Sequence, residues 1–351
     1  MTNFIVDYLK QKNLSSIPIS TFMELALYDE RNGYYQQEKT KIGLEGDFIT
    51  TSSISPFFAK VVCQWFYEQV VAEQFVPTFC EIGAGNGNFA YEFLTYWYEI
   101  SDIPLTYIVV EKSQSHLKEI KKKIQPFNNI EFYRDINELR ELNGVIFSNE
   151  LFDAFAVDIV KYEQEQWLEA NVTIGKNNEL QLIYVPCKRE ELLSYFTTYD
   201  LRVKSSFIYE IPLQMIRVYK QLAEKLISGK IVTVDYGYFH DELEEPMRKD
   251  GTLRCYYNHQ LLTNYLDNVG KCDLTTHIHW DTLRKVGEQN GLKTTELVNQ
   301  RQFLLNNNIL QFLKPTDGNP FSSEAKKNRQ ITQLIMDGSL SNAFHLLIQQ
   351  K

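Results

Sequence analysis

Cysteine is scarce in this sequence and shows no pairing pattern. The 351 residues include five cysteines, an odd number, at positions Cys63, Cys80, Cys187, Cys255 and Cys272. No two of them have CxxC spacing, which argues against a disulfide framework or a zinc cluster and favours a reducing compartment. His277 and His279 are two residues apart, but no third ligand stands at metal-binding spacing. The sequence therefore predicts no metal site.

Long apolar runs are absent as well. No stretch approaches the roughly 18 consecutive apolar residues of a membrane-spanning helix. Residues 1–12 contain Asp7 and no long apolar run, so they resemble neither a signal peptide nor an Arg-rich transit peptide. We therefore expect a cytoplasmic protein that does not contact a membrane.

Positive charge is the third deficit of the sequence. It has 45 acidic and 36 basic side chains, which gives a net charge of −9. Such a surface repels phosphate backbones, so no nucleic-acid partner is expected. The same charge favours a cationic partner, such as an arginine- or lysine-bearing protein segment, and a homodimer is left open.

The remaining composition is that of a globular protein. Hydrophobic residues make up 44% and charged residues 23% of the chain. The 22 Phe and 21 Tyr are interpreted as core and interface filling, not as a nucleic-acid stacking surface. The length suits one large α/β domain, or one such domain with a smaller companion.

Strands and helices alternate from residue 78 onward. The predicted strands are Thr78–Ile82, Tyr107–Val110, Ile130–Tyr133 and Gly144–Ser148. Helices are predicted between them at Phe89–Tyr98 and Ser115–Ile124. This order predicts an α/β fold with a doubly wound parallel sheet and helices on both of its faces.

The rest of the chain divides around this alternation. We predict an N-terminal helical region over 1–75, a cofactor-binding half over 76–156, an antiparallel insertion over 157–190, and the second half of the sheet with helical insertions over 191–351. Thr21 and Glu24 have the spacing of a capping box, which would begin a helix. A polar loop is expected between Asp235 and Trp280. The later elements are predicted at Leu213–Ile227, Lys230–Asp235, Trp280–Asn290, Lys293–Val298, Gln300–Leu313, Ser323–Met336 and Phe344–Gln349.

A glycine-rich turn follows the first predicted strand and precedes a helix. Its sequence is Glu81-Ile82-Gly83-Ala84-Gly85-Asn86-Gly87. Glycines at this point let the chain turn tightly and let a ligand lie against bare backbone, and the helix start presents free N–H groups. The pattern predicts a cofactor site, although a glycine turn without a ligand has the same local form.

The spacing of the glycines distinguishes between cofactors. A dinucleotide turn has the form G-x-G-x-x-G, but here the glycines fall at 83, 85 and 87, and Asn88 stands where the third would be. Glu81 precedes them, and its carboxylate suits an ammonium group better than a pyrophosphate. The pattern therefore favours S-adenosylmethionine, which carries an α-ammonium and a sulfonium, over NAD.

Two later strand ends carry further candidates for cofactor binding. Glu111 ends the second strand, where a carboxylate can accept hydrogen bonds from both ribose hydroxyls. Asp135 and Ile136 follow the third strand, where they could accept from an adenine amino group and pack against its ring. The alternative for Asp135, an ordinary acid at a strand end, is equally open.

Two acidic residues follow the fourth strand, at the edge of the sheet where active sites of this fold class lie. Glu150 and Asp153 are three residues apart, so they could face the same way in a turn or helix. Glu150 is the first candidate for a catalytic role at this edge, and Asp153 is the second. A solvated acidic turn is the alternative.

Seven short motifs together resemble the MidA family of S-adenosylmethionine-dependent methyltransferases, the family of the mitochondrial protein-arginine methyltransferase that assists complex I assembly. These motifs are Gly46–Thr51, Glu81–Gly85, Tyr133–Ile136, Asn149–Ala154, Asp235–Gly237, Gly251–Arg254 and Asp273–His277. They extend over nearly the whole chain from about residue 20. Two departures are Ala84–Gly87, where the family often has Pro-Gly-Arg-Gly, and Ser52-Ser53, where it often has Pro-Glu.

The resemblance implies a class I methyltransferase, Rossmann-like fold and a cofactor-covering loop within residues 1–75. It also implies that Glu150 faces the substrate, which would be a protein arginine. With the residues derived above, the expected contacts to S-adenosylmethionine are Asp47, Phe48, Thr50, Thr51, Glu81, Gly83, Ala84, Gly85, Gly87, Glu111, Asp135 and Ile136.

Three alternative functions remain. An NAD-type oxidoreductase is disfavoured by the glycine spacing. Methylation of adenine in nucleic acid requires a polar-Pro-Pro-aromatic motif after the fourth strand, and Asn149–Phe152 lacks both prolines. A non-catalytic or weakly catalytic assembly factor could keep this fold in order to bind a partner protein.

Overall fold

The computed structural model describes residues 3–36, 55–73, 75–257, 260–262, 264–316, 318–336 and 343–351. Within them the chain forms two compact units, each built from three separate stretches of sequence. Unit 1 comprises Met1–Lys39, Phe152–Tyr219 and Gly237–Val286, and unit 2 comprises Thr40–Leu151, Lys220–Tyr236 and Gly287–Lys351. None of the described helices is long and apolar enough to cross a membrane.

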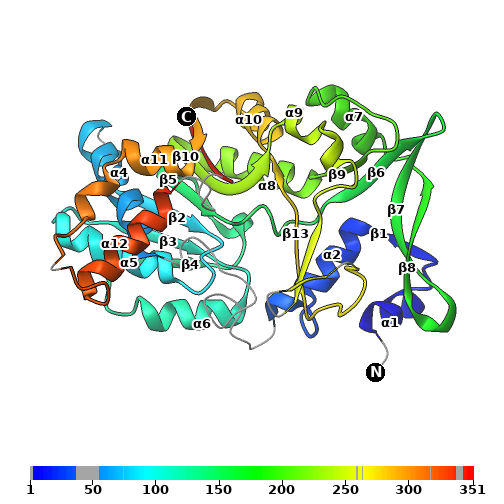
Figure 1. Cartoon of the computed structure of the whole chain (residues 1–351), viewed down its shortest axis with the longest axis horizontal. Helices are drawn as coiled ribbons and strands as arrows, with labels where there is room; N and C mark the ends of the chain where they lie inside the picture. Colours follow the sequence, from blue (N-terminus) through cyan, green and yellow to red (C-terminus); the bar gives the residue numbers. More distant parts are fainter. Residues whose placement is uncertain are drawn as a thin grey trace. The chain divides into compact units, whose positions relative to one another are not determined.

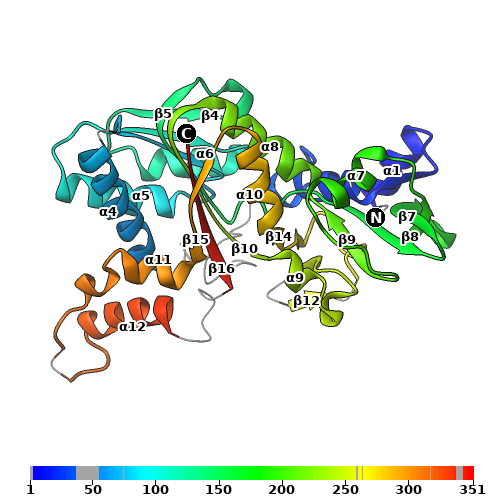
Figure 2. The ribbon, with the colours of Figure 1, turned by 90° about the horizontal axis from the view of Figure 1, so that it is seen from above.

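Unit 2 is built around a mixed sheet in the order β15-β16-β10-β5-β2-β3-β4 (Figure 1). Its strands are β2 (Thr78–Ile82), β3 (Thr106–Val110), β4 (Ile130–Tyr133), β5 (Leu142–Asn149), β10 (Leu226–Tyr238), β15 (Lys293–Asn299) and β16 (Phe344–Gln350). The five strands from β4 to β10 are parallel, whereas β16 pairs antiparallel with β10 and with β15. Figure 2 shows β16 between β15 and β10.

The strand order reverses at β2. From β2 the chain continues outward to β3 and β4, then returns to β5 on the other side of β2. In open α/β sheets a ligand crevice forms at such a switch point, outside the carboxyl ends of the strands. The ends of β2 and β5 are therefore where a cofactor site is expected.

With one exception, the helices of unit 2 lie where the sequence predicted helical structure. They include α4 (Pro56–Glu73), α5 (Asn88–Ile100), α6 (Gln114–Lys123), α11 (Gln300–Asn306) and α12 (Ser323–Ile335). The helix that begins at Pro56 fits the tolerance of proline for a first helical position. Gln300–Leu313 is not one helix, since a 3₁₀ turn, η5 (Ile309–Phe312), follows α11.

Aromatic rings fill the core of unit 2, as the composition predicted. Phe79 of β2 lies 4.2 Å from Phe93 of α5 between ring centroids, and Phe89 stacks on Phe147 at 4.5 Å. These rings belong to one continuous cluster that also contains Trp97. They bury large apolar areas under α4 and α5 and fix those helices on the sheet.

Unit 1 contains the predicted antiparallel insertion. Its main sheet runs β1-β7-β6-β9, with β8 paired to β7. The strands are β1 (Ser16–Pro18), β6 (Asp158–Glu163), β7 (Gln166–Ile174), β8 (Leu180–Pro186) and β9 (Ile208–Ile211). Asn177 and Asn178, both with positive φ, turn the chain between β7 and β8. The sheet packs with α1 (Phe4–Gln11) and α2 (Ile19–Tyr28) in a second core.

The capping box predicted at Thr21 and Glu24 is wrong. Helix α2 begins two residues before Thr21, with Pro18 as its N-cap and no side-chain cap. Ser20 instead donates a hydrogen bond to Asp158 of β6 at 2.5 Å. A tertiary contact, not the local motif, therefore sets the start of this helix.

The predicted polar loop before Trp280 is also wrong. It contains helix α9 (His240–Leu243), the three-stranded sheet β12-β11-β13 and the short strand β14, in addition to loops. These strands are β11 (Arg254–Tyr257), β12 (Gln260–Leu262), β13 (Asp273–Thr275) and β14 (Ile278–His279). Runs of two to four residues are too short to show a period of two, which is why the sequence pattern did not reveal them.

Helix α7 (Glu190–Thr198) was not predicted either, whereas α8 (Leu213–Lys225) and α10 (Trp280–Gln289) were.

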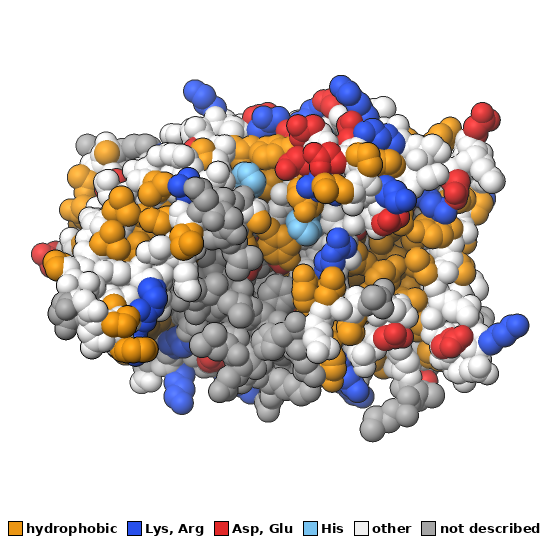
Figure 3. Space-filling model, viewed as in Figure 1, with side chains coloured by type: hydrophobic (Ala, Val, Ile, Leu, Met, Phe, Trp, Pro, Cys, Tyr) orange, Lys and Arg blue, Asp and Glu red, His pale blue; other side chains and the backbone are white. Residues whose placement is uncertain are grey.

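In Figure 3 acidic and basic side chains alternate over α7, α9 and α10. Two of the ion pairs in unit 1 join Lys285 to Asp200 at 2.6 Å and Arg284 to Asp281 at 2.9 Å. Pairs as exposed as these contribute little to stability.

Candidate active site

The glycine turn lies at the carboxyl end of β2, at the switch point of the sheet. Gly83, Gly85 and Gly87 have φ of +74°, +55° and +74°. This left-handed region disfavours residues with a Cβ, so each glycine is required by the path of the chain. Gly83 N donates to Val110 O at 2.8 Å, which ties the turn to β3. The resulting bare backbone fits a cofactor that lies across the turn.

Neighbouring side chains enclose two of these glycines. A Cβ on Gly83 would lie 2.7 Å from Leu151 Cδ1, and one on Gly87 would lie 2.9 Å from Ile120 Cγ1 of α6. Leu151 follows Glu150 in the sequence, so the segment after β5 is in contact with the cofactor turn. Lys123, also on α6, donates to Asn86 O at 2.7 Å and holds the middle of the turn.

Glu111 fixes the same turn from the end of β3. Its Oε2 accepts from Gly85 N at 3.0 Å, and its Oε1 accepts from Ser113 N at 2.8 Å. Each carboxylate oxygen has a second lone pair, so both retain the capacity to accept from a ribose hydroxyl. Glu111 thus shapes the turn and lies where the sequence predicted a ribose ligand.

Glu81 lies within β2 and is almost fully buried. Its Oε2 accepts a hydrogen bond from Tyr107 of β3 at 2.7 Å. The pKa of Glu81 is raised to about 8, because burial and, to a smaller extent, the nearby Glu111 outweigh the hydrogen bond from Tyr107, which lowers the pKa. A cofactor ammonium would favour the ionised form of this carboxylate. Tyr107 is a partner that the sequence did not predict.

Asp135 and Ile136 follow β4 at the start of a 3₁₀ turn, η2 (Ile136–Glu138). Asp135 Oδ1 accepts from Asn137 N at 2.8 Å and from Asn137 Nδ2 at 2.7 Å. The residue is therefore a cap for this turn, and its second oxygen is the one that could serve an adenine amino group. Ile136 is half-buried beside it.

Glu150 follows β5 in a strained conformation. Its φ is +50°, which is unfavourable for a residue with a long side chain. Its contacts include a hydrogen bond from Glu150 N to Val234 O at 2.9 Å and one from Asn149 Nδ2 to Glu150 Oε1 at 3.1 Å. Strain of this kind at the active-site edge of a sheet is typical of a functional position.

Asp153 belongs to unit 1, whereas Glu150 belongs to unit 2. The carbonyl oxygen of Asp153 accepts from Thr276 N at 2.9 Å, which ties it to the end of β13. Asp153 as a whole is 4% exposed. The predicted residues Asp47, Phe48, Thr50 and Thr51 lie outside the described residues, and Ala84 is buried in the glycine turn.

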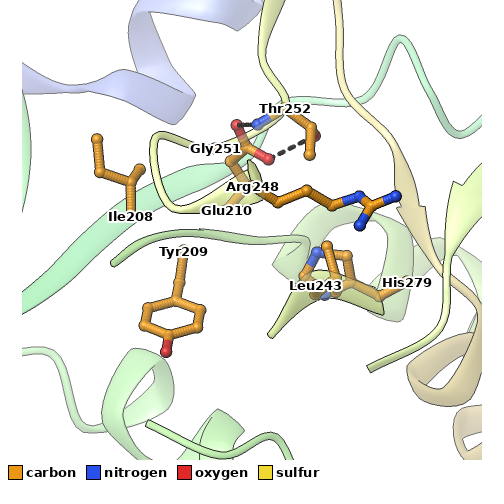
Figure 4. Close-up of a pocket in the computed structure, with 8 residues that line it drawn as sticks. All are labelled: Ile208, Tyr209, Glu210, Leu243, Arg248, Gly251, Thr252 and His279. Atoms are coloured by element: carbon orange, nitrogen blue, oxygen red, sulfur yellow. Dashed lines mark hydrogen bonds between the residues drawn. The ribbon is translucent and has the colours of Figure 1, made fainter. Parts of the chain in front are cut away.

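The Gly251–Arg254 motif forms a carboxylate-binding loop in unit 1 (Figure 4). Buried Glu210 of β9 accepts hydrogen bonds from Thr252 N and Thr252 Oγ1, both at 2.6 Å, and from Leu253 N at 2.5 Å. Gly251 has φ of +78°, and a Cβ there would lie 2.7 Å from Glu210 Oε1. The motif therefore has a structural role. Glu210 was not predicted, because the only local signal is an acid between the apolar residues Tyr209 and Ile211.

His277 is part of a stack next to this loop. Its ring lies 4.5 Å from that of Tyr238, nearly parallel, and the Arg248 guanidinium lies 3.9 Å from the same Tyr238 ring. Burial, and then Arg254 and Arg248, lower the pKa of His277 to about 4. His277 is therefore neutral at pH 7, and its backbone N–H donates to Thr252 Oγ1 at 3.1 Å.

His279 has a different set of partners. Its Nδ1 lies 2.7 Å from the hydroxyl oxygen of Tyr195, which in turn lies 2.6 Å from Thr282 Oγ1. His240 Nε2 lies 3.1 Å from the same Thr282 oxygen. Among the described residues, no three His, Cys, Asp or Glu side chains are grouped as metal ligands.

Comparison with known proteins decides the family. A family of S-adenosyl-L-methionine-dependent methyltransferases, Methyltransf_28, matches residues 59–298. The chain belongs to this family. The match covers the glycine turn, Glu111, Glu150 and the Gly251–Arg254 loop in one span. The cofactor of this methyltransferase is therefore S-adenosylmethionine, as the glycine spacing predicted, and an NAD-type reaction is excluded.

Curated relatives extend the comparison over most of the methyltransferase. "Protein arginine methyltransferase NDUFAF7, mitochondrial" of Mus musculus is 25% identical, over 90% of this chain and 77% of the relative. The Danio rerio protein of the same name is 26% identical, over 87% of this chain and 76% of the relative. These names refer to mitochondria, so they give no support to the expected cytoplasmic location.

A solved structure confirms the fold. A Burkholderia thailandensis protein, crystallised with S-adenosyl-homocysteine, superposes with a TM-score of 0.88 and 22% identity, over 99% of this chain and 90% of that one. A second crystal structure, of a native protein from the same organism, gives a TM-score of 0.86. The class I methyltransferase fold that the sequence predicted is thereby confirmed.

Proposed function

We propose that this methyltransferase transfers a methyl group to an arginine side chain of a protein substrate. The observation that carries the proposal is the position of Glu150, strained at the end of β5 and one residue from Leu151, which lies on the glycine turn. A carboxylate next to the cofactor turn can hold a guanidinium by charge-assisted hydrogen bonds. The net charge of −9 and the names of the curated relatives support a cationic protein acceptor.

The residues of unit 2 fit the bound cofactor, whose sulfonium supplies an electrophilic methyl group. The glycine turn would lie under it, Glu111 would accept from the ribose hydroxyls, and Asp135 with Ile136 would border the adenine. Glu81 would neutralise the α-ammonium. Asp47, Phe48, Thr50 and Thr51 are proposed to complete the site on the basis of the family resemblance alone.

Glu150 would bind and orient the acceptor guanidinium. A guanidinium is cationic at every working pH and has only donors, so a carboxylate can orient it and stabilise the charge that develops during transfer. Asp153 is the second candidate for this role. No nucleophilic side chain is required, because alignment and electrostatic stabilisation are sufficient for a direct displacement.

The test is labelled methyl transfer. The enzyme is incubated with lysate proteins and isotopically labelled S-adenosylmethionine, and modified residues are located by mass spectrometry. Label on arginine is the expected result. Label only on other residues would refute the arginine assignment. Cofactor binding without label on any protein would favour the non-catalytic assembly factor.

A further inference from the structure

Asn149 ends β5 immediately before the strained Glu150. Its Nδ2 donates to Glu150 Oε1 at 3.1 Å. The orientation of the amide follows from this contact, because a carboxylate oxygen can only accept a hydrogen bond. The amide nitrogen must therefore face Glu150, and Asn149 Oδ1 must face away from it.

Asn149 Oδ1 is buried, and no group in the described parts of the chain donates a hydrogen bond to it. Buried acceptors are nearly always paired, so an orphan of this kind calls for an explanation. The atom lies at the carboxyl end of β5, beside the glycine turn at the end of β2 and beside β10, where Val234 is the register partner of Asn149. An unpaired acceptor and a strained neighbour thus occur at consecutive positions of the active-site edge.

We propose that Asn149 Oδ1 accepts a hydrogen bond from an N–H of the acceptor guanidinium, so that Asn149 and Glu150 together select and orient the attacking nitrogen. This inference rests on the proposed arginine methylation. A guanidinium has five N–H donors in one plane and no acceptor. One donor can bond to the amide oxygen and another to Glu150, whose single negative charge matches the single positive charge of the substrate.

The arrangement also sets the direction of attack. Hydrogen bonds in the plane of the guanidinium leave the electron pair of the attacking nitrogen perpendicular to that plane. The nitrogen gains a bond to the methyl carbon, the electron pair of the broken carbon–sulfur bond stays with sulfur, and one N–H proton passes to Glu150 and then to solvent. The methylated guanidinium keeps its positive charge, so atoms and charges balance.

Two variants of Asn149 and one matched control test the role of the amide. Asn149→Ala removes the acceptor oxygen and the contact to Glu150. Asn149→Asp keeps an oxygen in place of Oδ1 but puts a second carboxylate beside Glu150. Asn143→Ala changes the same residue type at the exposed, opposite end of β5. Circular dichroism melting establishes that each variant is folded.

The measurements are kcat for an arginine-bearing protein at saturating cofactor and the affinity for S-adenosyl-homocysteine by calorimetry. For Asn149→Ala we expect kcat to fall by about tenfold or more, because one hydrogen bond to a charged group is lost. Cofactor affinity should stay within about twofold of the wild-type value. For Asn149→Asp we expect the acidic limb of the pH–rate profile to move to higher pH, because adjacent carboxylates lose their protons in two steps. Buried Asp235 on β10 is present in every variant and does not account for the shift.

Wild-type kcat and an unshifted pH–rate profile in the Asn149 variants would overturn the inference and leave arginine methylation intact. A wild-type enzyme that labels no arginine in any protein would overturn the proposed function and this inference with it. A fall in kcat that is equal in Asn143→Ala would also overturn the inference, because it would show a general effect on β5.

Discussion

Leu151 lies against Gly83, so that a Cβ added to this glycine would be 2.7 Å from Leu151 Cδ1. The contact joins the glycine turn after β2 to the segment after β5. If the cofactor lies on the glycine backbone and Glu150 holds the acceptor, as proposed above, both would therefore lie next to this contact. Orientation of this kind can supply much of the rate enhancement of a displacement reaction.

Gly83→Ala is expected to lower the affinity for S-adenosyl-homocysteine by about tenfold or more, because the new methyl must displace Leu151 and the left-handed φ disfavours alanine. Leu151→Ala in the same chain should restore part of the affinity by removing the clash. Calorimetric titration measures both. Gly291→Ala is the matched control, since Gly291 has φ of +83° with nothing within 4 Å of its added Cβ.

Glu111→Ala should weaken S-adenosyl-homocysteine binding by about 1.5–3 kcal/mol, the range for hydrogen bonds to a charged group. It should also lower the melting temperature of the ligand-free protein, because Gly85 N and Ser113 N lose their acceptor. Glu99→Ala, at an exposed acid on α5, serves as the control. A binding loss below twofold would assign the ribose contact to another residue.

Glu150→Gln keeps the shape of the side chain and removes its charge. Methyl transfer to arginine at saturating cofactor should fall by about 10²-fold, comparable to the loss of one strong transition-state contact. Cofactor affinity should hardly change. Glu141→Gln, an exposed acid just before β5, should leave both quantities at wild-type values. Recovery of full Glu150→Gln activity at saturating cofactor would instead mean that Glu150 serves only the cofactor.

Glu81 should make the stability of ligand-free unit 2 fall as the pH rises. Its pKa is raised to about 8 in the folded protein, from an ordinary value near 4.5. The contribution of protonated Glu81 to the free energy of unfolding is fully present below pH 4.5 and is lost as the pH rises through about 8. Cofactor affinity increases over the same interval, because the carboxylate becomes ionised. Hydrogen exchange in β2 and cofactor titrations between pH 6 and 9 measure the two effects. Glu81→Gln should flatten both curves.

His279 should give unit 1 the opposite dependence. Burial lowers its pKa to about 3, from an ordinary value of 6.5. The contribution of neutral His279 to the free energy of unfolding is therefore fully present above pH 6.5 and is lost as the pH falls toward about 3. The reason is that the unfolded chain binds the proton at a higher pH than the folded protein does. Hydrogen exchange in β14 between pH 7 and 4 tests this. An unchanged slope in His279→Gln would assign the acid sensitivity to other groups, such as His240.

Local sequence patterns predicted the alternation of strands and helices around the sheet and the glycine turn at the end of β2. Periodicity and turn residues are local, so each predicted strand from Thr78–Ile82 to Phe344–Gln349 could be recognised from its own neighbours. The acid before the turn and the spacing of the glycines also indicated the cofactor. These features depend on residues a few positions apart.

The contacts between residues far apart in the sequence became known from the folded structure alone. It paired Glu81 with Tyr107, placed Leu151 on Gly83, gave Glu150 its positive φ, and bound Glu210 to the Gly251–Arg254 loop. It also divided the chain into two units of interleaved segments. Such contacts depend on the packing of whole elements, and no local pattern encodes which side chain lies opposite another when loops and crossovers separate them.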